Sequence, residues 1–423
     1  MLAFTQAWAG PYAGTLLADW GAEVIQVESR RRFPVGTRGL NVESKGVVPE
    51  PERMWSRSYP DWDGGERPWN RYAPFNGLNR NKLGVTLEAS RAEGRELFLE
   101  LVALSDVVLE NDPPSVLNGF SLDYADLCKV KPDLIMARMS GYGLTGPYRD
   151  MRAWGSHIEG FIGHTWIRSY RDIDPSLKDD VYPSDAVAGI TTAFSILIAL
   201  RHLQATGEGQ LIDAPLSEGL VPFLADAFVD YSMNGRVQSA LGNADASMAP
   251  HNVYRCRGDD QWVSITVGSD EEWEGLVEAM GRPTWASDRR FRNVLGRWRL
   301  QEEIDDHIEK WTLELTSREA MEKLQGAGVP AGMVQDTAQA HVDPQLEALG
   351  FFQEVAHPEA GTHSYPGVMG RISGFPSRIR RPAPCLGEHN EYVYRELMGL
   401  TAEWYGELEK LGHIGDDYLM RSG

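Results

Sequence analysis

The chain is 423 residues long, which is more than one hydrophobic core usually supports, so we expect two domains or one large domain carrying a smaller one. A hydrophobic content of 42% with 13 Trp and 15 Tyr excludes a disordered chain. Asp and Glu outnumber Lys and Arg by 61 to 41, a net charge of -20 that argues against nucleic acid as a partner, and an anionic ligand would need a local cluster of cations or a helix N-terminus.

Cysteine and histidine spacing indicates neither a disulfide framework nor a metal site. The three cysteines are far apart and form no C-x-x-C pair: Cys128, Cys256 and Cys385. The apolar stretch from Ala186 to Leu200 is too short and too polar for a membrane span, so it predicts a buried helix. No basic segment followed by an apolar one opens the chain, and we therefore expect a cytoplasmic protein. From the cysteine and histidine spacing we expect no metal.

The first 28 residues have the pattern of a strand, a turn, a helix and a second strand. These predicted elements cover residues 2–5, 6–10, 11–20 and 22–28. Pro11 suits a first helical turn and Gly21 suits a helix end. The pattern predicts a βαβ unit.

Further strands and helices alternate up to the turn GYGLTGP at residues 141–147. The predicted strands are residues 84–88, 106–110 and 133–140, and the predicted helices are residues 91–105 and 124–130. Strands that alternate with helices imply an α/β fold, with a mainly parallel sheet covered on both faces.

Two regions depart from this alternation. Residues 30–75 are rich in Arg, Pro, Trp and Gly without periodicity, which predicts a long ordered loop or lid that either covers the sheet or contacts a bulky acid. After Asp213 the pattern changes to helices at 216–233 and 270–325, with short strands at 261–267 and 328–334. This change predicts a second domain.

The sharpest local feature is Asp185, just before the predicted apolar helix. Asp is among the commonest helix N-cap residues, and a capping role explains it without any chemistry. The positive end of a helix also keeps a carboxylate ionised, and an ionised carboxylate can attack a thioester. Taken alone, the position favours the capping role, which Ser184 could share.

The candidate phosphate-binding cations lie near the first two strand-to-helix connections. They are Arg30, Arg31, Arg32, Arg38, Arg80 and Lys82. The first loop, QAWAGPYAG, contains glycines but lacks both G-x-G-x-x-G and the P-loop pattern, which disfavours a nicotinamide cofactor.

Several segments in this order resemble the family III CoA-transferases, the group that includes formyl-CoA transferase and carnitine CoA-transferase. They are TQAWAGPYAGTLLADWGAEVIQVE, NRNKLGVTLE, SDVVLEN, GYGLTGPY, SDAVAG with ALRHLQATGEGQLIDAPLSEG, GVPAGMV, DPQL and PAPCLGEHN. The resemblance runs from residue 2 to about residue 400.

This resemblance implies a Rossmann-like large domain at residues 1–220, to which residues 340–423 return, and a small domain at 221–339, in an interlocked homodimer. It implies coenzyme A as the bound substrate and Asp185 as a nucleophile that forms a mixed anhydride and then an aspartyl-CoA thioester. By motif match, the residues implied to bind CoA are Ala7, Trp8, Ala9, Arg38, Lys82, Asn111, Gly141 and Tyr142.

Departures from the family pattern keep two alternatives open. Trp8 replaces a glutamine of formyl-CoA transferase, and GNADASMAPHN stands where that enzyme has a glycine-rich flap, which argues against a formyl or oxalyl substrate. Racemases on this fold use a histidine where this chain has Trp154, with His157 nearby. The alternatives are an acyl-CoA racemase or isomerase, and a non-catalytic CoA-binding subunit of a heteromer.

Overall fold

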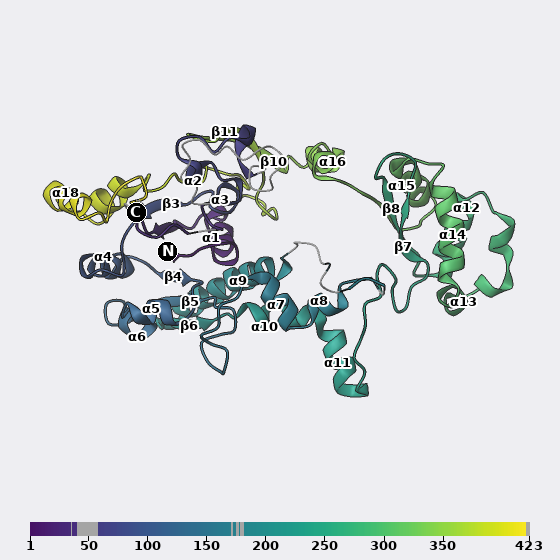
Figure 1. The fold of residues 1–423 in the computed structure, drawn as a ribbon, viewed down its shortest axis with the longest axis horizontal. Helices are drawn as coiled ribbons and strands as arrows, with labels where there is room; N and C mark the ends of the chain where they lie inside the picture. The colour runs from purple at the N-terminus through teal and green to yellow at the C-terminus, as the bar shows by residue number, and fades with distance from the viewer. Residues whose placement is uncertain (35, 40–57, 171, 175–176, 178–181, 420–423) are drawn as a thin grey trace. The chain divides into compact units, whose positions relative to one another are not determined.

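The computed structural model describes residues 1–34, 36–39, 58–170, 172–174, 177 and 182–419. The chain forms two compact units. A large unit contains Met1–Gly163, Asp180–Val229 and Gly350–Gly423, and a small unit contains His164–Asp179 and Asp230–Leu349. Both ends of the chain lie in the large unit (Figure 1). The domain boundaries predicted from the sequence, 220/221 and 339/340, remain predictions.

A six-stranded parallel sheet forms the centre of the large unit (Figure 1). Its strands are β1 (Leu2–Phe4), β2 (Ile25–Glu28), β3 (Leu83–Thr86), β4 (Val107–Glu110), β5 (Ile135–Arg138) and β6 (Gln210–Asp213). Their order is β3-β2-β1-β4-β5-β6, the order of doubly wound dinucleotide-binding sheets. The predicted α/β class with a parallel sheet is confirmed, and β6 is an additional strand that was not predicted.

The strands β4 and β5 contribute to two hydrophobic cores, one on each face of the sheet. Val107 and Leu109 pack into one core while Val108, between them, packs into the other. Successive side chains of a strand point to opposite faces, so a sheet covered on both faces requires continuous apolar runs such as VVL.

Helices from different parts of the chain cover these two faces. One core includes residues of α1 (Ala9–Asp19), α7 (Gly155–Phe161), α9 (Pro183–Thr206) and α10 (Leu216–Leu220). The other includes residues of α4 (Ala92–Ala103), α5 (Ser115–Gly119), α6 (Tyr124–Leu127), the π-helix Tyr392–Leu397 and α18 (Ala402–Lys410). The C-terminal segment therefore completes a core that the N-terminal half begins.

The part of the predicted loop at 30–75 that is described contains short helices, so the expectation of no regular structure is wrong there. They are the 3₁₀ helix Pro60–Trp62, the helix α2 (Pro68–Arg71) and the beginning of α3 (Ala73–Leu78). Arg71 donates to the carbonyl of Glu359, in the turn between β10 (Phe352–His357) and β11 (Gly361–Pro366). This segment contacts the turn of the hairpin. Residues 35 and 40–57 lie outside the described residues.

Helix α9 is longer and more exposed than the predicted buried helix at 186–200. Its 24 residues make it long and apolar enough to cross a membrane by length and composition alone, with 33% of its most apolar window buried. Core helices of soluble proteins meet the same criteria, and α1 and α10 pack against it. The helix begins at Pro183, so Asp185 lies in its first turn, and the alternative that Asp185 is the N-cap is wrong.

The small unit has its own antiparallel sheet and core. Its strands are β7 (His251–Arg255), β8 (Trp262–Thr266) and β9 (Ala331–Val334), in the order β7-β8-β9. Residues of α12 (Asp270–Ala279), α14 (Gln301–Thr312) and α15 (Ser317–Gly326) complete this core.

A buried ion pair connects the end of β2 to the segments around it. The Arg38 guanidinium donates to both carboxylate oxygens of Glu28, at 2.8 and 2.6 Å, and lies 3.4 Å from the ring centroid of Phe75. Its remaining nitrogen donates to the carbonyls of Trp69 and Pro384. Arg38 therefore holds together segments that are far apart in the sequence.

The first prediction concerns this pair. Arg38→Met leaves Glu28 buried without its cation, and we expect the unfolding free energy of the large unit to fall by about 3–5 kcal/mol. Urea unfolding followed by circular dichroism measures the change. The double variant Arg38→Met/Glu28→Leu should recover most of the loss because no unpaired charge remains, and a double variant as unstable as the single one would contradict the prediction.

Candidate active site

A cavity of about 400 Å³ opens in the large unit where the order of the sheet reverses. From β1 the chain proceeds to β2 and β3 on one side, while β4 lies on the other, so the loops after β1 and β4 diverge and leave a crevice. The lining residues are Gln6, Ala7, Arg32, Phe33, Pro34, Asn111, Asp112, Pro113, Val116, Met139, Gly141, Met151, Arg152, Ala153, Trp154, Gly155, Asp185 and Leu216.

The loop after β1 is fixed by the residue that follows β4. The Gln6 amide donates to Asn111 Oδ1, and Asn111 Nδ2 donates to the Gln6 carbonyl, both at 2.8 Å. A Cβ at Gly10 would lie 2.7 Å from Asn111 Cγ, so this close approach requires glycine. Ala7 has a φ of 61°, and its amide donates to Thr37 Oγ1 at 2.6 Å. Two predicted CoA-binding residues, Ala7 and Asn111, therefore lie together in the cavity wall.

Asp185 lies in the same wall, in the first turn of α9, and only 9% of its surface is exposed. Ala9, the first residue of α1, contributes a backbone hydrogen bond that favours the ionised form of this carboxylate. The carboxylate thus faces the N-terminal end of one helix from within the first turn of another, and both helix ends favour a negative charge.

Burial nevertheless raises the pKa of Asp185 to about 6. Desolvation is the largest cause, the Ala9 hydrogen bond opposes it, and the like charge of Glu159 adds to it. At neutral pH such a carboxylate is still mostly ionised, and it is more basic than an exposed aspartate. Both properties suit a nucleophile.

Gly155 allows α7 to approach this carboxylate closely. A Cβ at Gly155 would collide with Asp185 Oδ2 and with Ser184 Oγ. Its φ is not in the left-handed region, so the requirement for glycine here comes from space and not from backbone conformation. The residue was not among the predicted site residues, since no motif marks a glycine needed only for close approach.

Most of the predicted cations are committed to other contacts. Arg30 donates to the carbonyls of Ile414 and Asp417 at 2.7 Å, and Arg80 forms a buried pair with Asp19 at 2.8 Å. Lys82 Nζ donates to Pro11 O, Leu78 O and Asn79 Oδ1, and burial lowers its pKa to about 7. Arg38 and Lys82 do not line the cavity, so the structure does not place them with the other predicted residues. Their predicted phosphate pairing remains a prediction.

Two arginines do line the cavity: Arg32, from the predicted cluster, and Arg152, which was not predicted. Both side chains are exposed, and both lower the pKa of the buried Asp112, which burial raises. Arg152 precedes α7 by only three residues. The sequence signal for Arg152 was a basic residue soon after the GLTGP turn, but this residue belongs to no recognisable motif.

The remaining predicted residues lie next to the cavity. Trp8 is the N-cap of α1 and packs edge-on against Tyr182, with ring centroids 5.9 Å apart. Tyr142 packs edge-on against Phe161 at 5.0 Å, and Gly141 beside it does line the cavity.

The histidine near Trp154 does not line the cavity. His157 Nδ1 accepts a hydrogen bond from the Trp154 amide at 3.1 Å at the start of α7, while Trp154 itself is in the cavity wall. Among the described residues that line this cavity there is no histidine, and no group that could hold a metal ion occurs in the described part of the chain.

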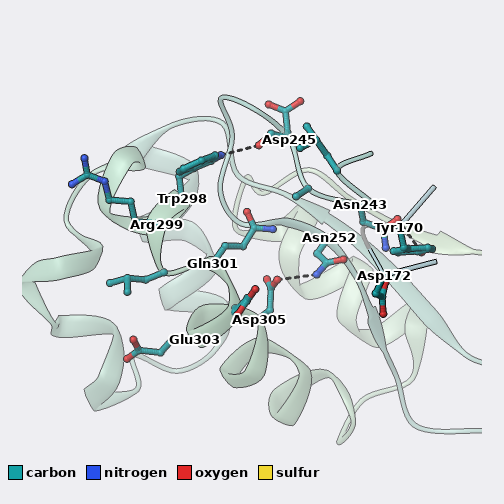
Figure 2. A pocket seen from close by; sticks show the side chains of 15 residues that line it. Tyr170, Asp172, Asn243, Asp245, Asn252, Trp298, Arg299, Gln301, Glu303 and Asp305 are labelled. Carbon is teal, nitrogen blue, oxygen red and sulfur yellow. Dashed lines mark hydrogen bonds between the residues drawn. The ribbon is translucent and has the colours of Figure 1, made fainter. Parts of the chain in front are cut away.

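A larger cavity, about 680 Å³, lies in the small unit (Figure 2). Asp245 and Trp298 meet on one side of it, and Asp305 accepts a hydrogen bond from Asn252 on the other. Among the described residues that line it, the acidic side chains are Asp172, Asp245, Glu302, Glu303 and Asp305, and Arg299 is the one cation. Such a lining repels phosphates, so we assign an anionic ligand to the cavity of the large unit.

The chain belongs to CoA-transferase family III, whose family model matches residues 1–390. The resemblance noted in the sequence is therefore confirmed, and so is the prediction that the chain is an acyl-CoA:carboxylate CoA-transferase.

Named relatives and a solved structure agree with this assignment. The chain is 34% identical to succinyl-CoA–D-citramalate CoA-transferase of Chloroflexus aurantiacus, over 93% of this chain and 92% of the relative. It is 31% identical to the succinyl-CoA–L-malate CoA-transferase alpha subunit of the same organism, over 93% and 87%. A CAIB/BAIF family protein from Brucella suis matches with a TM-score of 0.77 at 28% identity, over 94% of this chain and 97% of that one.

The second prediction tests the close approach at Gly155. Gly155→Ala should push aside the Asp185 carboxylate, which the resemblance implies is the nucleophile. We expect CoA-transferase activity to fall roughly 100-fold, since small displacements of a reacting group have such effects. The matched control is Gly160→Ala on the same helix, where a Cβ meets nothing within 4 Å. Steady-state kinetics measure the CoA-transferase activity of both variants, and equal activities would contradict the prediction.

Proposed function

We propose that this enzyme transfers CoA from an acyl-CoA to a free carboxylic acid, with Asp185 as the nucleophile. The observation that carries this proposal is the buried Asp185 carboxylate in the wall of the cavity at the reversal of the sheet, beside the Ala9 amide. The family assignment supports the overall reaction, and the geometry supports the role of this aspartate.

In the first half of the reaction, the Asp185 carboxylate attacks the thioester carbonyl of the donor. The carbon–sulfur bond breaks, CoA leaves as a thiolate, and Asp185 becomes a mixed anhydride. The thiolate then attacks the aspartyl carbonyl, the anhydride carbon–oxygen bond breaks, and the donor acid leaves as a carboxylate. Asp185 now holds CoA as a thioester.

The second half repeats these steps in reverse with the acceptor acid. The acceptor carboxylate attacks the aspartyl-CoA thioester, CoA leaves as a thiolate, and a new mixed anhydride forms between Asp185 and the acceptor. The thiolate then attacks the acceptor carbonyl of this anhydride, and the bond to Asp185 breaks. The products are the acceptor acyl-CoA and the regenerated Asp185 carboxylate. No proton, electron or water is consumed, so the reaction needs no metal or redox cofactor in its balance.

The Ala9 amide is the candidate donor to the oxyanion that forms when a carbonyl bonded to Asp185 is attacked. It lies at the N-terminal end of α1 and already interacts with the carboxylate. A fixed backbone donor in a largely buried site stabilises developing negative charge more than a solvated one does.

The cavity also suggests where CoA binds. Ala7, Asn111 and Gly141 line it, which supports their predicted contacts to CoA, and Trp8 and Tyr142 border it. Arg32 and Arg152 supply the positive charge for the phosphates. Arg38 is bound to Glu28 and Pro384, and Lys82 to Pro11, so for these two residues we propose a structural role instead of direct phosphate pairing.

The relatives suggest dicarboxylic acids as substrates. Their names combine succinyl-CoA with D-citramalate and with L-malate, and all three acids are dicarboxylic. We therefore propose a short dicarboxylic acyl-CoA as the donor and a dicarboxylic acid as the acceptor. No feature of the described cavity favours a racemase, since Trp154 occupies the position of the racemase histidine.

The exposed face of α9 supports a dimer. Ile190, Phe194, Leu197 and Ile198 lie on it at helical spacing and are 45 to 63% exposed. An apolar stripe of this kind indicates a protein interface, and we propose a second copy of the chain as its cover, in the interlocked arrangement that the resemblance implies. The three cysteines are free, which suits the proposed cytoplasmic location.

The third prediction tests the nucleophile. The enzyme incubated with succinyl-CoA should gain the mass of CoA less water, and hydroxylamine should remove this adduct. Asp185→Asn should form no adduct and lose CoA transfer, because an amide cannot attack the thioester. Intact-mass spectrometry measures both.

Asp213→Asn is the control, since this carboxylate accepts a hydrogen bond from the Leu144 amide and does not line the cavity. An adduct on Asp185→Asn, or its absence from the wild type with every acyl-CoA tried, would contradict the proposed mechanism. In the second case, deuterium exchange at the acyl α-carbon would test for a racemase.

The fourth prediction concerns the two cavity arginines. Arg32→Gln and Arg152→Gln should each raise the KM for the acyl-CoA roughly tenfold, the effect of about 1.4 kcal/mol, with kcat little changed. Arg149→Gln is the matched control, because Arg149 is exposed, pairs with Asp150 and does not line the cavity. A KM that rises equally in all three variants would show that only the overall charge matters.

A further inference from the structure

A second buried carboxylate lies one turn further along α7 from Gly155. Glu159 is 1% exposed, and its Oε1 accepts a hydrogen bond from Ser184 Oγ at 3.3 Å. Ser184 is fully buried and directly precedes Asp185 in the first turn of α9. The proposed mechanism gives Glu159 no role, although burial of a carboxylate is costly.

Helix α7 contacts this turn of α9 twice. Gly155 lies against the Asp185 carboxylate, and Glu159 binds the neighbouring Ser184. The spacing of four residues places both on the same face of α7. The helix therefore holds the nucleophile in position and also brings a negative charge close to it.

We propose that Glu159 is a positioning residue whose charge destabilises the resting carboxylate of Asp185 relative to its acylated forms. This inference rests on the proposed function and deepens it. In the resting enzyme both carboxylates are buried, and Glu159 binds Ser184, the residue next to Asp185. In the mixed anhydride and in the aspartyl-CoA thioester, the Asp185 side chain is neutral and the repulsion is absent, so covalent capture of the donor relieves it.

On the other described helices around Asp185, the groups that face it act in the opposite direction or carry no charge. Helix α1 contributes the Ala9 amide, which favours the ionised carboxylate, and α10 contributes the apolar Leu216. Arg32, Arg152 and the carboxyl of Asp112 also line the cavity, and both arginines lower the pKa of Asp112. On the helices packed around Asp185 in the described structure, Glu159 is thus the group whose charge opposes ionisation.

The pKa of Asp185 agrees with this geometry. Burial is the larger cause of its rise to about 6, and the charge of Glu159 is the further cause in the same direction. A carboxylate with a raised pKa binds its proton more tightly, and by the same repulsion it should also bind an acyl group more tightly.

One interaction free energy should therefore appear in two measurements. Removing the Glu159 charge should lower the pKa of Asp185, and it should lower the equilibrium constant for forming aspartyl-CoA from acyl-CoA. Because both product forms of Asp185 are neutral, the two changes should match, with half a pKa unit corresponding to roughly a threefold change in the equilibrium constant.

The test is Glu159→Gln, which keeps an acceptor for Ser184 and removes the charge. We expect the acid limb of the kcat/KM profile, near pH 6 in the wild type, to move to lower pH by about half a unit to one unit. The aspartyl-CoA fraction at a fixed ratio of succinyl-CoA to succinate at pH 7.5, measured by intact mass, should correspond to a roughly three- to tenfold smaller constant.

Two further variants separate charge from structure. Glu218→Gln removes an exposed carboxylate from α10 and should change neither measurement. Glu159→Asp keeps the charge and should retain the wild-type acid limb even if kcat falls. A Glu159→Gln variant that is slower but shows an unmoved acid limb and an unchanged adduct constant would overturn the proposal.

Failure of the proposed function has a different signature. A wild type that forms no aspartyl-CoA from any acyl-CoA refutes the nucleophilic role of Asp185 itself. A wild type that forms the adduct, together with a Glu159→Gln variant that forms it to the same extent, refutes only the role of Glu159.

Discussion

The site depends on the parallel pairing of β1 with β4. Because β2 and β3 continue on one side of β1 while β4 lies on the other, the two loops that follow β1 and β4 must separate, and the crevice between them holds the cavity. The reciprocal hydrogen bonds of Gln6 and Asn111 then fix the width of this crevice from both sides. The cavity is a property of the sheet topology, and the chemistry is added by the helices that border it.

The packing of helix ends around Asp185 determines both the position of its carboxylate and its pKa. The carboxylate is buried where α7 approaches closely enough to exclude a Cβ at Gly155, and burial is the main reason its pKa rises to about 6. The Ala9 amide limits the rise, so the group remains an anion at neutral pH. A more exposed aspartate would be easier to ionise and a weaker base.

The sequence predicted the fold well where a local pattern determines it. Apolar runs and alternating helices predicted the covered parallel sheet. The polar residue ahead of an apolar stretch drew attention to Asp185, but by itself it favoured a helix cap, and only the family resemblance implied a nucleophile. The sequence could not predict the roles of residues that depend on contacts between distant segments of the chain. Nothing local distinguishes Arg32, which faces the cavity, from Arg38, which is buried against Glu28. Gly155 and Arg152 become visible only when α7 is placed against α9.

The large unit is assembled from segments at both ends of the chain, and this has a consequence for its synthesis on the ribosome. The core on one face of the sheet needs Val393, Tyr394 and Leu408, while Arg30 finds its acceptors at Ile414 and Asp417. While the small unit is being translated, the apolar residues of α4 and β4 on this face await those partners. The nascent chain therefore lacks the cover for this surface until the last part of its synthesis, and exposed apolar surface of this kind favours aggregation.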